Sequence, residues 1–259
     1  MVDSSYAIAG ALTGFVVGMT GVGGGALMTP ILLLFFGVLP ATAVATDLWF
    51  AAITKVIAAS LHGRSGRVDW QVVKRLWSGS LPVALCVVML VSQGAKVARV
   101  AWLAQAVGAL VLVTAVGMIA APRLHALARG RRLSDSAKFK AAQPALTVVA
   151  GVLLGACVAL TSVGAGALGS VMLLYLYPLR MTPHRLIATD IVHAIPLAVV
   201  AGAGYLYAGL VDGHMLMSLL AGSVPSVVLG SLLAARFSGR RLQIALSFAL
   251  LVVGLKAIV

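Results

Sequence analysis

Long apolar runs separated by short polar turns dominate the chain. A membrane-spanning helix needs about 20 predominantly apolar residues, and six runs approach or exceed that length. They occupy residues 43–61, 71–93, 97–121, 183–207, 214–235 and 242–258. The pattern therefore predicts an all-α integral membrane protein with six full spans.

Two further apolar regions, residues 5–38 and 145–178, are each interrupted by small and polar residues. Their flanks have about 14–16 residues, roughly 21–24 Å of helix, which is short of the roughly 30 Å hydrocarbon core. Each region is therefore a re-entrant helical hairpin or one helix broken near its middle. The first interruption comprises Thr20, Gly21, Val22, Gly23, Gly24 and Gly25; the second comprises Thr161, Ser162, Val163, Gly164, Ala165 and Gly166.

Composition agrees with a membrane protein. The chain is 61% hydrophobic and 10% charged, whereas soluble domains are about 25% charged. This excludes a cytosolic enzyme, a secreted domain and a disordered protein. The net charge of +13 does not indicate nucleic-acid binding, because the basic residues lie in short turns as the positive-inside rule expects. Cys86 and Cys157 lie within apolar runs, so neither a disulfide framework, a metal cluster nor a cofactor is expected.

The basic residues also predict the orientation in a bacterial-type cytoplasmic membrane. The linker 122–142 carries six of them, which places it in the cytoplasm. If both interrupted regions are hairpins, 15 of the 19 Lys and Arg residues are cytoplasmic and both termini lie outside. A single broken helix would instead put the five arginines after residue 179 outside. The hairpin interpretation is therefore favoured.

The chain contains an internal repeat. The segment 20–27 matches 161–168. In each of three later matches, the second copy lies 143 residues after the first. Each repeat (1–121 and 143–259) would hold one hairpin and three spans, and an odd number of crossings inverts the second copy. Inverted repeats with interrupted helices are typical of secondary transporters. The later matches are Ala45-Thr46-Asp47 with Ala188-Thr189-Asp190, Val68-Asp69 with Val211-Asp212, and Gly79-Ser80-Leu81-Pro82 with Gly222-Ser223-Val224-Pro225.

These motifs resemble the sulfite exporter TauE/SafE family of permeases. The resemblance rests on the run Thr-Gly-Val-Gly-Gly-Gly-Ala-Leu-Met-Thr-Pro at 20–30, on Ala-Thr-Asp-Leu and Ile-Thr-Lys within 45–55, on His62, and on Val68-Asp69-Trp70. The second copy resembles the second half of the family. The resemblance implies movement, chiefly export, of small sulfur-containing oxyanions such as sulfite or organosulfonates. Members of the family often carry Ser where this chain has Asp47 and Asp190.

The two interruptions are the candidate substrate-binding segments. At each, a second half-helix begins near Gly25 or Gly166, and its N-terminus directs free N–H groups and about +0.5 of partial charge into the site. Thr20, Thr161 and Ser162 could add hydroxyl donors. The alternative is that the glycines only permit a sharp turn or close helix packing.

Asp47 and Asp190 fall inside predicted spans, where an ionisable residue indicates function. They could accept hydrogen bonds from the hairpins, carry a coupling proton or bind a cation. The alternative is structural, namely capping of the following helices, with Thr46 and Thr189 as further candidate caps. Capping also explains Asp69 and Asp212, which follow turns.

Lys55 and His193 complete the candidate set. Lys55 could pair with an acid across the bundle, provide a cationic step on the anion path, or extend to the cytoplasmic surface. His193 follows Asp190 by three positions, so the two could form a pH-sensitive pair; a satisfied interior histidine is the alternative.

The sequence thus predicts a secondary transporter for a small oxyanion, driven by a proton or sodium gradient or by the membrane potential. A transporter in which Asp47 and Asp190 hold a cation or neutral solute is the alternative. An ATP-driven pump is unsupported, because no Lys-Ser/Thr follows Gly25. An embedded enzyme is not expected either, since the chain has no Glu and no intramembrane His-rich motif.

Overall fold

The computed structural model describes residues 3–20, 25–62, 68–94, 136–164 and 166–233, with a few single positions between 105 and 120 and after 247. Every regular element in these ranges is a helix, and five helices are long and apolar enough to cross a membrane. The expected spans 97–121 and 242–258 and the interruption residues 21–24 lie outside the described ranges. The described part of the chain is therefore all-helical, and its five long apolar helices indicate a multi-pass membrane protein.

The helices follow the apolar runs closely. Short helices flank the first interruption and follow the second, and longer helices come after them where full spans were expected. A proline lies inside each of α2, α4, α6, α8 and α9, which a helix tolerates in lipid when neighbours satisfy the freed carbonyl groups. The bounds are α1 Ser4–Thr20, α2 Gly25–Phe35, α3 Pro40–His62, α4 Trp70–Gly94, α6 Ser136–Thr161, α7 Ala167–Leu176, α8 Pro183–Tyr207 and α9 Gly213–Leu233.

Helix α6 corrects one expectation. It begins at Ser136, inside the segment expected to be a linker (122–142), and has 26 residues. Its apolar part, Phe139–Thr161, is long enough to cross the membrane, so the expectation of a short flank before the second interruption is wrong. The start was missed because Ala, Lys and Gln between 137 and 143 are good helix formers. They extend the helix beyond the apolar run that marked its expected boundary.

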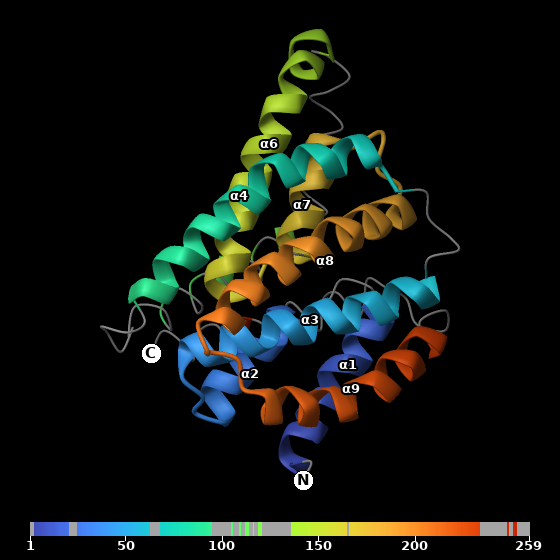
Figure 1. The fold of residues 1–259 in the computed structure, drawn as a ribbon. Coiled ribbons are helices and arrows are strands. Elements are labelled where there is room, and N and C mark those ends of the chain that lie inside the picture. Colours follow the sequence, from blue (N-terminus) through green and yellow to red (C-terminus); the bar gives the residue numbers. More distant parts are fainter. Residues whose placement is uncertain are drawn as a thin grey trace.

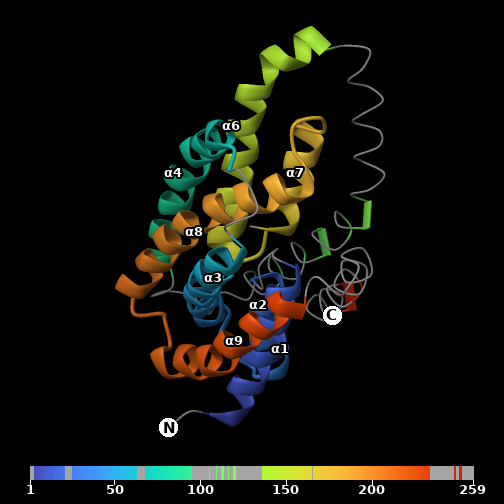
Figure 2. The ribbon, with the colours of Figure 1, turned by 90° about the vertical axis from the view of Figure 1, so that its right-hand side faces the viewer.

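The described helices form two bundles joined at one crossing (Figures 1 and 2). In the α3 bundle, α1 and α3 pack against α9, and α2 packs against α3. In the α8 bundle, α4 packs against α6 and α8, and α7 packs against α6 and α8. Helices α3 and α8 pack against each other and join the bundles. Each bundle therefore combines helices from both halves of the chain.

Two seams within these bundles depend on glycine. Along α1 and α9, and along α4 and α6, a Cβ added at several glycines would overlap backbone atoms of the facing helix. Small residues allow such close backbone approach in membrane helices. In the first seam Gly10 faces Leu219, Gly14 faces Ser223 and Gly222 faces Ala7; in the second Gly151 faces Leu76, Gly155 faces Ser80 and Gly79 faces Val148.

The main apolar core lies where α3 crosses α8. Leu48 of α3 and Leu197 of α8 are fully buried there, together with small residues that keep the two helices close. Tyr205 is also fully buried, and its hydroxyl donates to the carbonyl of Ala159 at 2.8 Å. The indole N–H of Trp49 donates to the carbonyl of Gly202 at 3.0 Å and so ties α3 to α8 directly. This core holds the buried polar residues described next.

Candidate functional site

Four ionisable side chains are buried on the central helices. Asp47 and Lys55 lie on α3 and are 0% and 3% exposed, and Asp190 and His193 lie on α8 at 2% and 1%. A charged side chain at the bilayer centre costs at least about 2.5–3.5 kcal/mol without a partner. The contacts of these four residues therefore decide what the site can do.

Asp47 contacts the second half-helix of the first interrupted region. The backbone N–H and the hydroxyl of Thr29 in α2 both donate to Asp47 Oδ2, at 3.2 and 2.5 Å. The Ser162 hydroxyl lies close enough to interact with the same carboxylate. Within the part of the chain that the structure describes, however, neither that hydroxyl nor Asp47 Oδ1 makes a well-formed hydrogen bond. Asp47 thus lies between α2 and the second interruption.

Asp190 lies against the second half-helix of the other interrupted region. A Cβ added at Gly169 of α7 would lie 2.6 Å from Asp190 Oδ1, so only glycine leaves room for the carboxylate. Lys55 Nζ is 4.0 Å from Asp190 Oδ2. Neither oxygen of Asp190 accepts a hydrogen bond from the described residues.

Lys55 lies at the centre of the cluster. Besides the ion pair with Asp190, it is within electrostatic range of Asp47 and of His193. Because its side chain is 4% exposed, it does not extend toward the membrane surface, which was one of the alternatives for this residue. One buried cation therefore serves two buried carboxyl groups.

His193 finds its partners on α4. Its Nε2 lies 3.0 Å from Ser80 Oγ, and its carbonyl accepts a hydrogen bond from Trp77 Nε1 at 3.2 Å. Asp190 is three positions earlier on α8, but no ion pair between the two is found among the described residues. The environment is that of a satisfied interior histidine.

The capping interpretation of Asp47 and Asp190 is wrong. Helix α3 begins at Pro40, and α8 begins at Pro183 with Thr182 as its N-cap, which accepts from the N–H of Arg185. Both aspartates therefore lie about two turns inside their helices. Proline at the first helical position favours such an early start.

Thr46 and Thr189 do not cap these helices either. Thr189 Oγ1 accepts a hydrogen bond from the backbone N–H of Asp69 at 3.1 Å, and Thr46 Oγ1 accepts one from Asp212 at 3.2 Å. Capping by Asp69 and Asp212 is confirmed, since their Oδ1 atoms accept from backbone N–H groups three residues later.

The second interruption forms a tight, buried turn. Ser162, Gly164 and Gly166 have φ angles of 56°, 120° and 133°, a left-handed region that strongly favours glycine. Thr161 donates to the carbonyl of Cys157 at 2.7 Å and accepts from the N–H of Val163 at 3.2 Å, so its hydroxyl proton is used within the turn.

A donor remains at this turn, because Ser162 is a buried side chain whose hydroxyl has no hydrogen bond among the described residues. Gly166 precedes α7 without a side-chain cap. Ala165 and, in the first interruption, Gly21, Val22, Gly23 and Gly24 lie outside the described residues. Thr20 ends α1 and Gly25 begins α2.

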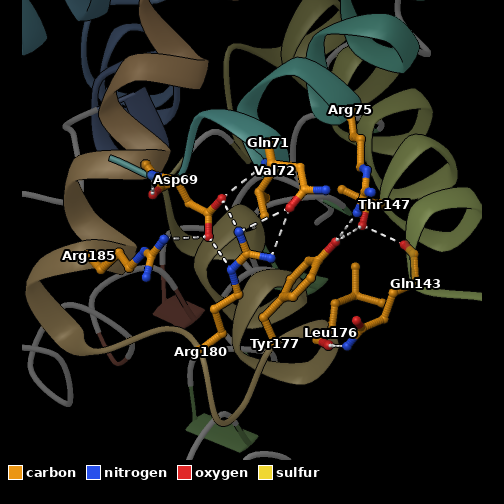
Figure 3. Close-up of polar contacts among 11 residues, drawn as sticks. Asp69, Gln71, Val72, Arg75, Gln143, Thr147, Leu176, Tyr177, Arg180 and Arg185 are labelled. Atoms are coloured by element: carbon orange, nitrogen blue, oxygen red, sulfur yellow. Dashed lines mark hydrogen bonds and ion pairs between the residues drawn. The ribbon is translucent and has the colours of Figure 1, made fainter. Parts of the chain in front are cut away.

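A second charged network was not expected from the sequence. Asp69 is 2% exposed; Arg180 pairs with it in two places, Nε to Oδ2 at 2.6 Å and the terminal nitrogen to Oδ1 at 2.8 Å. Arg185 adds a contact to Oδ2 at 3.0 Å (Figure 3). Sequence reasoning treated both arginines only as orientation signals, because nothing along the chain links them to Asp69.

Several long apolar helices around a buried charged cluster define a multi-pass membrane protein of the transporter class. The family described as "Sulfite exporter TauE/SafE" matches residues 6–257. The chain belongs to this family of membrane transporters.

Two curated relatives come from Bacillus subtilis (strain 168). "Probable membrane transporter protein YjnA" is 35% identical over 256 residues, covering 98% of this chain and 99% of the relative. "Probable membrane transporter protein YunE" is 37% identical over 59 residues, covering 23% of this chain and 22% of the relative. No solved structure matches the chain.

Proposed function

We propose that this transporter moves a small sulfur-containing oxyanion, of the sulfite or organosulfonate class, out across the cytoplasmic membrane. The observation that carries the proposal is the buried Ser162 hydroxyl, which lies near Asp47 without a hydrogen bond to the described residues. Lys55 supplies a cation in the same cluster. A buried hydroxyl that approaches a carboxylate without forming a well-aligned hydrogen bond keeps its proton available, so it can donate to a bound anion.

In this proposal the two interruptions, Thr20–Gly25 and Thr161–Gly166, hold the anion. Backbone N–H groups at the starts of α2 and α7 and the Ser162 hydroxyl replace part of its hydration. Lys55 offsets the charge of the anion. Thr46 and Thr189 support the site through their hydrogen bonds to the loops before α9 and α4.

Charge balance favours proton coupling. Lys55 provides one positive charge, whereas Asp47, Asp190 and a monovalent anion would bring three negative charges into a buried site. Protons on the carboxyl groups reduce that excess, so binding of the substrate would be linked to protonation of Asp47 and Asp190. His193 would hold α8 in place beside the cluster through its contacts with Ser80 and Trp77 of α4.

We further propose that the chain consists of two inverted repeats with both termini outside. Two pairs of matching contacts support this. The hydrogen bond between Thr46 and Asp212 corresponds to the one between Thr189 and Asp69. The close approach of Gly222 to Ala7 corresponds to that of Gly79 to Val148. Alternating access would then be a movement of the α3 bundle against the α8 bundle. The Lys55–Asp190 pair and the Ser162–Asp47 approach join the two bundles at the substrate site.

A second candidate function has its own observation. Asp47 Oδ1 and both oxygens of Asp190 accept no hydrogen bond from the described residues, and carboxylate oxygens are also cation ligands. In this alternative, Asp47 and Asp190 bind a cation such as sodium as the transported species. Thermal stabilisation of the purified protein by sulfite, compared with stabilisation by sodium at constant pH, separates the two candidates.

Ser162→Gly tests the anion site. Glycine tolerates the left-handed backbone at this position, so the variant should fold as well as the wild type while lacking the hydroxyl. We expect sulfite flux into proteoliposomes to fall roughly 10- to 100-fold in kcat/KM, as for the loss of a hydrogen bond worth about 1.5–3 kcal/mol to a charged group.

Ser223→Ala is the matched control. Ser223 is also buried without a hydrogen bond among the described residues, but it lies in the α1–α9 seam away from the interruptions. Its variant should transport at the wild-type rate. Wild-type flux in Ser162→Gly, or equal losses in both variants, would contradict the placement of the anion.

A further inference from the structure

A cavity of about 640 Å³ with both basic and apolar lining residues lies apart from the central cluster, among α4, α6 and the segment after α7. Its lining includes three basic side chains, Arg75, Lys140 and Arg180. Helix α7 has ten residues, about 15 Å at 1.5 Å per residue, and separates this cavity from the second interruption. The cavity is therefore distinct from the proposed transport site.

Arg75 is held in place by a directed chain of hydrogen bonds (Figure 3). The Thr147 hydroxyl donates its one proton to the carbonyl of Gln143 at 2.7 Å. Tyr177, whose hydroxyl is 2.7 Å from Thr147 Oγ1, must therefore be the donor in that pair. The Tyr177 oxygen is then left to accept from Arg75, at 3.4 Å. This fixes one corner of the guanidinium group at the cavity.

The cavity keeps an excess of positive charge. Arg180 is paired with Asp69 and also donates to Gln71 Oε1 at 3.1 and 3.2 Å. Within the described ranges, no carboxylate pairs with Arg75 or Lys140. Because an arginine has five N–H donors and Arg75 uses one with Tyr177, donors remain for a ligand with several acceptor oxygens.

The cavity lies at the depth of the membrane surface, because it adjoins the ends at which the apolar parts of α4 and α6 begin. It lies beside Phe139, where the apolar part of α6 begins, and beside the first turns of α4, which starts at the exposed Trp70. Tryptophan is enriched at this depth, where lipid headgroups lie. Pro144 and Leu179 add an apolar side to the lining.

We infer that this cavity binds a phosphate-type oxyanion at the membrane surface, through Arg75 and Lys140. The headgroup of an anionic phospholipid and a free inorganic oxyanion share this chemistry. Basic pockets between transmembrane helices bind anionic lipid headgroups in the same manner.

The test uses the full-length protein, purified in detergent and stripped of lipid. Its midpoint of thermal unfolding is followed during titration with phosphatidylglycerol, with phosphatidylcholine, and with inorganic phosphate in the absence of lipid. We expect phosphatidylglycerol or phosphate to raise the midpoint and phosphatidylcholine to leave it unchanged. In the double variant Arg75→Gln, Lys140→Gln, the apparent affinity should be about tenfold or more weaker, at about 1 kcal/mol per basic residue near the surface.

Lys74→Gln is the matched control, since Lys74 is exposed on α4 next to Arg75 but does not line the cavity; it should bind as the wild type does. If the double variant does not fold, Lys140→Gln alone replaces it, because the Lys140 side chain is exposed. Its apparent affinity should be about fivefold weaker, which corresponds to about 1 kcal/mol. A response confined to phosphatidylglycerol assigns the site to a lipid, and a response to phosphate assigns it to a soluble anion. No response to either ligand, wild-type binding by the cavity variant, or an equal loss in Lys74→Gln overturns the inference.

Discussion

Replacing Lys55 with methionine should lower the free energy of unfolding by about 3–5 kcal/mol, as expected when one partner of a buried ion pair is removed. Lys55 is buried within 4.0 Å of Asp190 and within electrostatic range of Asp47. Methionine fills a similar volume, so the loss would reflect charge and not a cavity. Sulfite flux should fall to background in the same variant. Unfolding in detergent, followed by tryptophan fluorescence, measures the first effect.

A second substitution makes this prediction specific. In Lys55→Met combined with Asp190→Asn, the carboxylate that pairs directly with Lys55 is also removed and only Asp47 is left without the cation, so part of the lost stability should return while flux stays at background. Lys74→Met, at an exposed position of α4, should change stability by no more than about 0.5 kcal/mol. A Lys55→Met protein as stable as the wild type, or a double variant no better than the single one, would show that the pair does not stabilise the crossing of α3 and α8.

Replacing Gly222 with alanine should destabilise the protein by about 3 kcal/mol, at the upper end of overpacking effects. The added Cβ would overlap the carbonyl oxygen of Ala7, a backbone atom that cannot move without separating α1 from α9. Helix propensity alone favours alanine over glycine by about 0.8–1.0 kcal/mol. Packing in the seam thus makes Gly222→Ala destabilising, whereas the same substitution would stabilise an isolated helix.

Gly213→Ala provides the comparison within the same helix, because nothing lies within 4 Å of a Cβ added there; it should be neutral or slightly stabilising. Gly79→Ala should match Gly222→Ala if the two seams are equivalent, since its Cβ would overlap the carbonyl of Val148. Thermal unfolding of the three purified variants measures all these effects. Equal stability of Gly222→Ala and Gly213→Ala would mean that α1 and α9 do not approach as closely as described.

The helices were predictable because the bilayer imposes one strong rule, a long apolar run for each span. Helices α3, α4, α8 and α9 follow that rule. The start of α6 does not, because helix propensity extends it into polar sequence at Ser136, where hydropathy gives no signal. The pairing of α1 with α9 and of α4 with α6 was not predicted, although the glycines that permit it stood at regular spacing in the sequence.

The candidate site was predictable only in part. Asp47, Lys55, Asp190 and His193 stand out as ionisable residues within apolar runs. Their partners do not: Thr29 and Ser80 are ordinary small polar residues, and their roles depend on which helices pack together. A threonine four positions after Gly25, in the first turns of a half-helix, was the available signal for Thr29. The Asp69–Arg180 pair joins residues 111 positions apart, which no local pattern reveals.

The exchange of helices between the two halves bears on how the chain assembles during synthesis. The described helices of the α8 bundle have all been made once Tyr207 is complete, whereas the α3 bundle still lacks α9, which ends at Leu233. Since domains generally fold in the order in which they are made, the earliest helix would ordinarily be the earliest to pack. Here α1 can contact α2 and α3 early, but its glycine face at Gly10 and Gly14 gains its partner only when α9, the last helix with described bounds, is inserted. Helix α1, made before the other described helices, therefore reaches its full set of contacts only after α9 is inserted.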